Sequence, residues 1–375
     1  MTAPTLRGDI ASGWEPVRDA FAAIVNGPAE RGAGLHVIHH GVTVVDLYDG
    51  AHGPDTTQVI FSASKGVAAA CLAVLADRGD LDLDAAVTRY WPEFGRHGKS
   101  AITVAQLLSH QAGLIAPWRP VTLAEVLEGR PLAAALAAER PRWPLGTPAY
   151  HAVTWGTLAD ELVRRVTGGR LGEVLADLVC RPHGLAIGIG APAGSAPLPV
   201  HAAARIPVTV RLVTAIFARL GTPLWQAMTV QGAIDEPPDL WVRRPETLDA
   251  HLPAANAVAT APGLARLYAM LLPGAETPLV GERTLHAVIR PRVAGRDRVL
   301  GVPSAFGCGF ALPSRAWRLG SASAFGHPGI GGALGLADPR RDLALAFLPL
   351  AMPADALNDA RHRTLLDAVT KVIGP

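Results

Sequence analysis

The apolar residues near the start of the chain follow first a helical and then a strand spacing. They recur at three- and four-residue intervals over residues 14–25, which predicts an amphipathic helix. Residues 35–40 and 42–48 are rich in β-branched and apolar residues and meet at Gly41. This pattern predicts two strands joined by a tight turn.

The last 70 residues show the same two spacings in the reverse order. Residues 306–312, 332–337 and 343–350 have strand character, and the polar segment 338–342 predicts the turn between the last two. Residues 355–373 then predict a closing amphipathic helix. Because short turns favour antiparallel pairing, we expect two strands from the start and three from the end to form one sheet covered by the terminal helices.

The middle of the chain is helical and rich in proline. Residues 67–77 are apolar almost all round, which predicts a buried helix, and Gly79 is placed to end it. Three more helices are predicted, over residues 103–109, 154–167 and 260–272. The proline-rich segments 115–149 and 186–250 predict long loops and short helices, the usual material of a wall that encloses a substrate.

These patterns predict an α+β fold with two subdomains. The 375 residues are 49% hydrophobic, which is ample for a buried core and long for a single compact unit. We expect an antiparallel sheet of about five or more strands in a discontinuous α/β subdomain, residues 1–80 and 250–375. Residues 81–249 form the predicted helical subdomain, and the active site is expected between the two.

Charge and composition narrow the classes of function. The chain carries 34 basic and 32 acidic residues, and charged residues make up only 18% of it. No block of like charges occurs, so we expect no nucleic-acid partner. This balance fits an enzyme or a small-molecule binder, and it leaves open whether the chain forms a homo-oligomer.

The sequence predicts neither a secretory signal nor a metal site. The first residues have no basic cluster followed by an apolar run, and no stretch of about 18 apolar residues predicts a membrane span. Cys71, Cys180 and Cys308 are odd in number and far apart, which predicts reduced, buried thiols in a cytoplasmic protein. No Cys/His cluster has zinc-ligand spacing, so we expect neither metal nor cofactor.

The first candidate for chemistry is the segment Ser62-Ala63-Ser64-Lys65, just before the apolar helix. On a helix, residues 62 and 65 share one face, with Cβ atoms about 5–6 Å apart. A serine hydroxyl needs a base to become a nucleophile, and burial among apolar residues lowers the pKa of a lysine until it can act as one. Ser64 faces elsewhere, so Ser62 is the predicted nucleophile. The alternative is a helix cap followed by an ordinary lysine.

The second candidate is Tyr150, which follows a rigid loop containing Pro144, Gly146 and Pro148. A tyrosine phenol can share the transfer of a proton with a lysine. The alternative is a core aromatic residue whose hydroxyl is simply satisfied.

The third candidate is the glycine-rich run from Gly326 to Gly332, which leads into a strand. Glycine lets a strand edge approach a ligand closely. The N–H of Ile330 could join that of Ser62 in an oxyanion hole, whereas Pro328 has no N–H to offer. The alternative is a glycine-rich turn with an incidental histidine.

Five stretches in this order resemble the serine β-lactamase and penicillin-binding-protein superfamily. They are FSASKG, WPEF with ITVAQLLSHQAGL, PAYHAVTWG, FGHPGIGG and LGLADPRRDLALAFLPL. The nearest branch is the class C-like esterases, the family VIII carboxylesterases, and the resemblance covers nearly the whole chain. It implies a β-lactamase-like fold and an S-x-x-K serine hydrolase.

The resemblance also implies a role for each motif residue. Ser62 is the acylated nucleophile, Lys65 its general-base partner, and Tyr150 the carrier of the proton to and from the leaving group. Ile330 supplies the oxyanion donor through its backbone N–H. His327 stands where the β-lactamases have a lysine.

Two departures from the β-lactamase pattern favour neutral esters as substrates. The strand motif begins with His327, which weakens the fixed positive charge that grips a substrate carboxylate. The tyrosine motif ends in Ala152, which removes an amide donor usually aimed at an amide-containing substrate.

Other residues of the motifs and loops are candidates for substrate binding. Gly329 and His151 lie within two of the motifs. Trp118, Trp225 and Trp241 lie in the predicted loop regions and form either the walls of the site or part of the core.

The predicted function is therefore hydrolysis of short-to-medium carboxylic esters through an acyl-enzyme on Ser62. A β-lactamase, or a peptidase or amidase acting on D-amino acids, would use the same serine. An acyltransferase of this fold would prefer a thioester donor and an alcohol acceptor over water. A catalytically silent binding protein on the same fold is a further alternative, against which the intact Ser62, Lys65 and Tyr150 argue.

Overall fold

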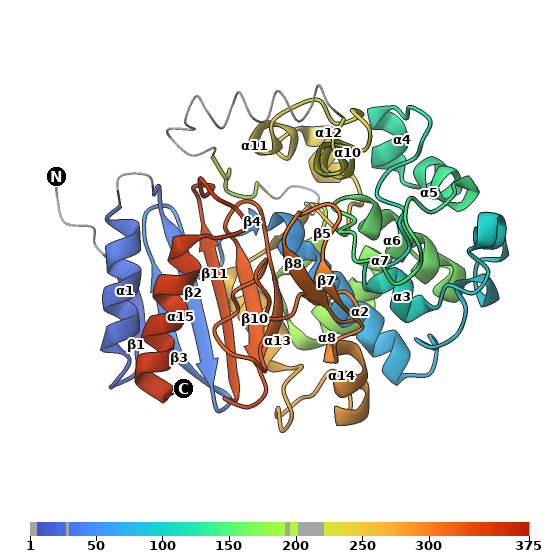
Figure 1. Ribbon diagram of the computed structural model, residues 1–375. Helices are drawn as coiled ribbons and strands as arrows, with labels where there is room; N and C mark the ends of the chain where they lie inside the picture. Colours follow the sequence, from blue (N-terminus) through green and yellow to red (C-terminus); the bar gives the residue numbers. More distant parts are fainter. Residues whose placement is uncertain (1–5, 28–29, 192–195, 202–220, 375) are drawn as a thin grey trace.

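A six-stranded antiparallel sheet forms one half of the molecule (Figure 1). The computed structural model describes residues 6–27, 30–191, 196–201 and 221–374. The strands lie in the order β1-β3-β2-β11-β10-β9, so the two ends of the chain join where β2 pairs with β11. The strands are β1 Arg7–Ile10, β2 Ala33–His39, β3 Val42–Tyr48, β9 Phe325–Pro328, β10 Leu334–Asp338 and β11 Leu343–Pro349. The predicted antiparallel sheet built from both ends of the chain is confirmed, with β1 as an additional edge strand.

Helices cover both faces of this sheet. The terminal helices α1 (Glu15–Val25) and α15 (Ala360–Ile373) lie side by side on one face, and α13 (Ala261–Ala269) packs on the other (Figure 1). Every residue of β11 is buried, as expected of a strand covered on both sides. The closing helix begins at Ala360 rather than at residue 355, because the Asp359 side chain caps it by accepting the Arg361 N–H at 3.0 Å.

Helix α2 (Ser64–Asp77) runs through the centre of the molecule. It contacts β9 of the sheet as well as α6 and α7, and its residues 64–75 are all buried. Such complete burial explains why its sequence is apolar all round, as predicted. The chain enters the helix through a short 3₁₀ turn, η1 (Phe61–Ala63), and leaves it at Gly79, whose φ is +80°.

The other half of the molecule consists of short helices. The predicted helices over 103–109, 154–167 and 260–272 correspond to α3, α6 and α13. The helices here and around α2 are α3 Val104–Leu108, α4 Leu123–Glu128, α5 Arg130–Ala138, α6 Thr154–Thr167, α7 Leu171–Leu175, α8 Arg181–His183, α10 Pro223–Thr229, α11 Pro238–Trp241, α12 Pro245–Asp249 and α14 Glu282–Ile289. Two 3₁₀ segments are η2 Val87–Arg89 and η3 Pro92–Gly98, and η4 Ala176–Cys180 is a π-helical segment. Residues 192–195 and 202–220 of the predicted loop region lie outside the described residues. The subdomain boundaries at residues 80 and 250 stay a prediction.

Small sheets connect the two halves. Strands β4 (Gln58–Val59), β6 (Ala257–Ala259) and β5 (Ile187–Ile189) form one of them, in that order. The hairpin of β7 (Val293–Arg296) and β8 (Pro303–Phe306) forms the other.

The predicted strand over residues 306–312 is wrong. Strand β8 ends at Phe306, and the chain then turns, with the Gly307 N–H donating to the Phe310 carbonyl at 2.9 Å. Gly309 has a φ of +86°, and a Cβ there would lie only 2.8 Å from the ring of Trp155. Because this backbone must pass so close to α6, it cannot continue as a strand with side chains on both sides. The strand that completes the sheet is β9, so His327 lies within a strand rather than in the turn before one.

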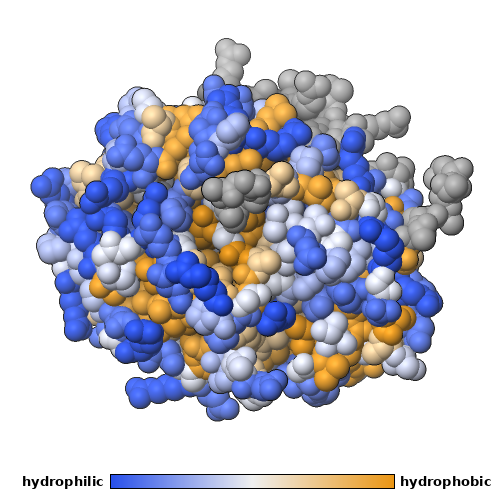
Figure 2. Space-filling model, turned by 180° about the vertical axis from the view of Figure 1, so that it is seen from behind, coloured by the Kyte–Doolittle hydropathy of each residue, from blue (hydrophilic) through white to orange (hydrophobic). Residues whose placement is uncertain are grey.

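The surface mixes charged and apolar residues, in keeping with the low charged fraction. Figure 2 shows hydrophobic patches between charged ones on the rear face. The large hydrophobic side chains that are exposed among the described residues are Val42, Trp118, Leu145 and Leu240. Within the same ranges, no helix has the length and apolar character needed to span a membrane. The three cysteines are buried and free of disulfides, as predicted.

Candidate active site

Ser62 lies on the η1 turn between β4 and α2, where the backbone is unusual. Phe61 has a φ of +49°, the left-handed conformation that a non-glycine residue adopts only when its surroundings hold it there. The side chain of Phe61 is buried, and so is Ala63 on the other side of Ser62. Ser62 itself is partly exposed, so the turn presents its hydroxyl at the surface of a fixed apolar platform.

The Lys65 side chain is completely buried beside this hydroxyl. Its Nζ lies 3.2 Å from the Ser62 Oγ, 2.7 Å from the carbonyl oxygen of Ala152 and 3.1 Å from that of Ala254. Burial lowers the pKa of Lys65 well below its usual value. An uncharged amine has two hydrogens, which the two carbonyls accept, and one lone pair, which is then left to face the Ser62 hydroxyl.

Ser64 has a different and structural position. Its buried hydroxyl donates to the Phe61 carbonyl and accepts the Ala257 N–H at 3.0 Å. It therefore ties β6 to the start of α2 and is not free to attack a substrate.

Tyr150 lies next to the serine and the lysine. Its ring centre is 4.9 Å from the Lys65 Nζ, and its phenol interacts with the Ser62 hydroxyl. Burial raises the pKa of the Tyr150 phenol, and the interaction with Ser62 opposes this rise only in part. The phenol is therefore protonated at neutral pH and has a proton to donate. The three residues singled out from the sequence thus lie around one point.

Two residues that position Tyr150 are not singled out by the sequence patterns, although one of them, His110, lies within the stretch ITVAQLLSHQAGL. The buried carboxylate of Asp297 accepts the Tyr150 N–H at 3.1 Å and the Val299 N–H at 2.8 Å. The buried ring of His110 lies 5.0 Å from the Tyr150 ring, and its Nδ1 accepts the His151 N–H at 3.0 Å. An isolated aspartate predicts nothing by itself, and the stretch around His110 does not say which residues its side chain contacts. Only the folded chain therefore shows that both residues position Tyr150.

The glycine turn after β9 approaches the serine from the sheet side. A Cβ at Gly329 would collide with the Ile60 carbonyl, and one at Gly331 would lie 2.6 Å from the Phe61 ring. Glycine at both positions therefore lets the turn pack directly on the η1 platform. No hydrogen bond within the described residues uses the N–H of Ser62 or of Ile330. Both groups are available as donors to a substrate oxygen.

His327 is fully buried and uncharged. Its Nδ1 lies 2.8 Å from the Pro328 carbonyl, which can only accept, so Nδ1 carries the proton. Its Nε2 has no partner among the described residues. Burial lowers the pKa of His327 to about 3. This part of the site therefore holds no positive charge at neutral pH.

The other predicted substrate-binding residues have diverse environments. His151 is buried, and its Nε2 already accepts the Leu114 N–H at 2.9 Å. Trp241 is buried in the core, Trp225 is partly buried, and Trp118 is 56% exposed. The Arg142 guanidinium stacks on the Trp118 ring at 3.8 Å and also donates to the Gln226 side chain at 2.8 Å. Their roles in substrate binding stay a prediction.

Nothing in the described part of the chain resembles a metal centre, because no three His, Cys, Asp or Glu side chains converge there. The arrangement of a partly exposed hydroxyl, a buried amine, a phenol and two N–H groups without a partner among the described residues is suited to acyl transfer on serine.

Comparison with known proteins gives matches along almost the whole chain. The profile of the Beta-lactamase family matches residues 17–369. The esterase/beta-lactamase LipL of Mycobacterium tuberculosis is 33% identical over 354 residues, which cover 88% of this chain and 79% of the relative. The structure of EstA from Arthrobacter nitroguajacolicus Rue61a has 35% identity and a TM-score of 0.86, with 97% of each chain covered. That of a family VIII carboxylesterase has 31% identity and a TM-score of 0.86, with 98% of this chain and 99% of that chain covered.

Proposed function

The chain belongs to the beta-lactamase family of serine hydrolases, and from this premise we propose that it is a carboxylesterase acting through an acyl-enzyme on Ser62. The observation that carries the proposal is the environment of Lys65. Two backbone carbonyls occupy the hydrogens of its buried amine, and the Ser62 Oγ lies 3.2 Å away on the remaining side. A general base is thereby held against the hydroxyl of Ser62, which is partly exposed, whereas that of Ser64 is buried.

Acylation begins with transfer of the Ser62 proton to Lys65, while Oγ attacks the ester carbonyl carbon. The developing negative charge on the carbonyl oxygen is stabilised by the N–H groups of Ser62 and Ile330. Tyr150 then protonates the leaving alkoxide and recovers its proton from Lys65. The ester C–O bond breaks, the alcohol departs, and an acyl-Ser62 ester remains.

Deacylation repeats these steps with water in place of the serine. Tyr150 accepts a proton from the attacking water while it passes its own proton to Lys65. The bond between the acyl carbon and Ser62 Oγ then breaks, Oγ takes the proton back from Lys65, and the carboxylic acid departs. We propose that the α/β and helical subdomains meet at this point, with Ser62, Lys65 and Ile330 on one side and Tyr150 on the other.

The preference for neutral esters rests on the charge of the site. A β-lactam substrate carries a carboxylate, which a fixed cation would bind, and His327 is uncharged at neutral pH. Ala152, whose carbonyl holds Lys65, has no side-chain amide to bind a substrate amide. Both features reduce binding of β-lactams and peptides without affecting binding of a simple ester.

Hydrolysis of β-lactams is the second candidate, because the relative LipL carries both activities in its name. A chain-length series of p-nitrophenyl esters, with nitrocefin alongside, separates the two. We expect turnover of acetate to hexanoate esters well above that of nitrocefin, and its loss in Ser62→Ala. Faster turnover of nitrocefin than of every ester would favour the second candidate, and full activity in Ser62→Ala would refute both.

A further inference from the structure

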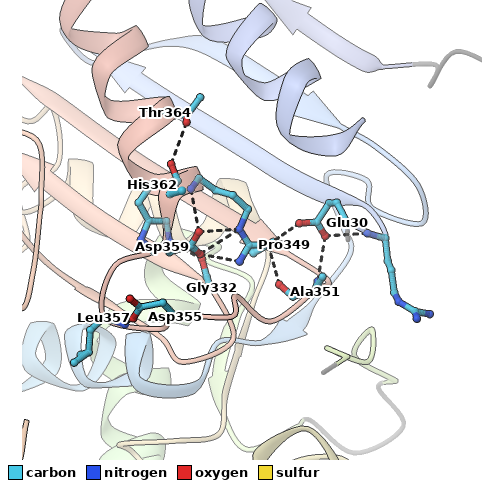
Figure 3. A network of polar contacts seen from close by, with 12 residues as sticks. Glu30, Gly332, Pro349, Ala351, Asp355, Leu357, Asp359, His362 and Thr364 are labelled. Carbon is cyan, nitrogen blue, oxygen red and sulfur yellow. Dashed lines mark hydrogen bonds and ion pairs between the residues drawn. The ribbon is translucent and has the colours of Figure 1, made fainter. Parts of the chain in front are cut away.

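A buried charged network lies beside the glycine turn, next to Gly332 (Figure 3). Arg361, at the start of α15, binds Asp359 through its Nε and Nη2 atoms at 3.0 and 2.7 Å and Glu30 through Nη1 at 2.6 Å. The side chains of Glu30 and Asp359 are only 2% and 3% exposed. This network has no part in the chemistry proposed above, yet it is more deeply buried than a surface ion pair would be.

The network contacts the turn at Gly332. The His362 Nε2 lies 2.7 Å from the Gly332 carbonyl, and since a carbonyl only accepts, the ring N–H must donate. Gly332 has a φ of +92°, and a Cβ there would collide with the Arg361 guanidinium and lie 2.9 Å from Pro349. The turn is therefore enclosed between this network and the Ile60–Phe61 platform that carries Ser62.

The contact at Gly332 is transmitted to the N–H of Ile330 by covalent geometry. The Gly332 N–H donates to the Gly329 carbonyl at 2.9 Å, which fixes the plane of the peptide between Gly329 and Ile330. That peptide is trans, so its N–H points opposite to its carbonyl. Holding the Gly329 carbonyl toward Gly332 therefore points the Ile330 N–H the other way.

We infer that His362, supported by Asp359, Arg361 and Glu30, is a positioning residue that orients the Ile330 N–H toward the oxyanion. The inference rests on the proposed function, because it assigns the network to the oxyanion site of that same reaction. The network acts through the turn and touches no reacting atom. Its effect should fall on the transition state, in which the oxyanion forms, more than on binding of the substrate.

The test is His362→Phe, which removes the N–H and keeps an aromatic ring. The variant should pack well, because the His362 ring already lies edge-on to Phe347, with the ring centres 6.2 Å apart. We expect kcat for p-nitrophenyl butyrate to fall about 10- to 100-fold, somewhat less than the loss of an oxyanion donor itself, with KM within about threefold of wild type. Affinity for a phenylboronic acid, whose oxygen occupies the oxyanion position, should fall by a similar factor.

Two further variants separate orientation from stability. His362→Gln restores a donor and should recover kcat to within about threefold of wild type. Ser323→Ala is the matched control, since it removes one donor from the buried Asp338, at the far end of β10 from the turn. It should lower the melting temperature without changing kcat. If His362→Phe does not fold, Glu30→Gln tests the same network, with an expected two- to fivefold loss in kcat.

The inference is overturned if kcat and boronic acid affinity of His362→Phe stay within twofold of wild type. It is also overturned if Ser323→Ala loses kcat to the same extent. Failure of the proposed function is visible separately, since the wild type would then neither hydrolyse esters nor become labelled at Ser62 by a fluorophosphonate.

Discussion

Replacing Lys65 with methionine tests the central claim that this lysine is an uncharged base. Methionine has a similar length and fits an apolar site, but it can neither accept a proton nor donate to a carbonyl. The claim predicts a loss of activity without a matching loss of stability. We expect ester hydrolysis to fall about 10²- to 10⁴-fold, the usual contribution of a general base.

The stability of the variant follows from two opposing effects. Without the amine, the carbonyls of Ala152 and Ala254 lose their donor, which costs on the order of 1–3 kcal/mol for each buried group. Against this, the wild type must deprotonate Lys65 to bury it. That cost is about 1.4 kcal/mol for each pH unit by which the ambient pH lies below the ordinary lysine pKa. It stops growing once the pH falls below the lowered pKa of the folded state. The two effects largely cancel at neutral pH.

The pH dependence of stability gives the decisive measurement. The unfolded wild type holds a proton on Lys65 that the folded protein has released, so the folded state gains stability as pH rises toward about 10. Relative to Lys65→Met, the wild type should become more stable by up to about 1.4 kcal/mol per pH unit over this range. Urea denaturation of both proteins at pH 7, 8, 9 and 10 measures the difference.

Parallel stability curves for the two proteins would refute this reasoning, because they would mean that the folded and unfolded states bind the same number of protons at position 65. Retention of wild-type activity in Lys65→Met would refute the assignment of the base. Lys65→Arg is the control with a permanent charge, and it should be both inactive and strongly destabilised.

Three further predictions follow from the site. Ser64→Ala should keep most of the esterase activity and lose about 1–3 kcal/mol of unfolding free energy, since a buried N–H of β6 loses its acceptor. A urea titration measures the stability and an ester assay the activity, and loss of activity at constant stability would contradict the prediction. Asp297→Asn should lower kcat about tenfold through displacement of Tyr150, and a change confined to KM would argue against this. The folded-state pKa values of His151 and His327 are lowered to about 4 and about 3, so their contribution to stability is present above pH 6.5 and is lost as the pH falls from there toward 3. The melting temperature of the wild type should therefore drop as the pH is lowered from 7 to 4, and that of His327→Gln should drop less steeply.

Much of the architecture is readable from the sequence because it depends on local spacing. The terminal helices, the hairpin of β2 and β3 and the hairpin of β10 and β11 each have an apolar pattern that matches their final environment. The helix α2 is instead apolar all round, which matches its complete burial. The S-x-x-K spacing similarly brings residues 62 and 65 to one face without help from the rest of the chain. These are properties of segments of a few to about 15 residues.

The strand predicted over residues 306–312 shows where local spacing fails. Its apolar residues fit a strand, but Gly309 must pass within contact distance of Trp155 on α6, 154 residues earlier in the chain. The same limit applies to the tryptophans, of which Trp241 is buried and Trp118 is exposed against Arg142. A strand and a turn, or a buried and an exposed tryptophan, can have the same residue types at the same spacing. Only the segment that packs against them differs, and that segment is distant in the sequence.

The chemistry of the site shows the same division. From the sequence alone, Ser62, Lys65 and Tyr150 can be proposed as the catalytic residues. His327 can be proposed to weaken the positive charge that a lysine supplies at this position in the β-lactamases. The sequence does not determine the protonation of the lysine, because the carbonyls that accept its hydrogens lie 87 and 189 residues away. It likewise contains no sign of Asp297 behind Tyr150 or of His362 beside the glycine turn. Burial and hydrogen bonding between distant segments set the pKa and the direction of an N–H, so these properties exist only once the chain has folded.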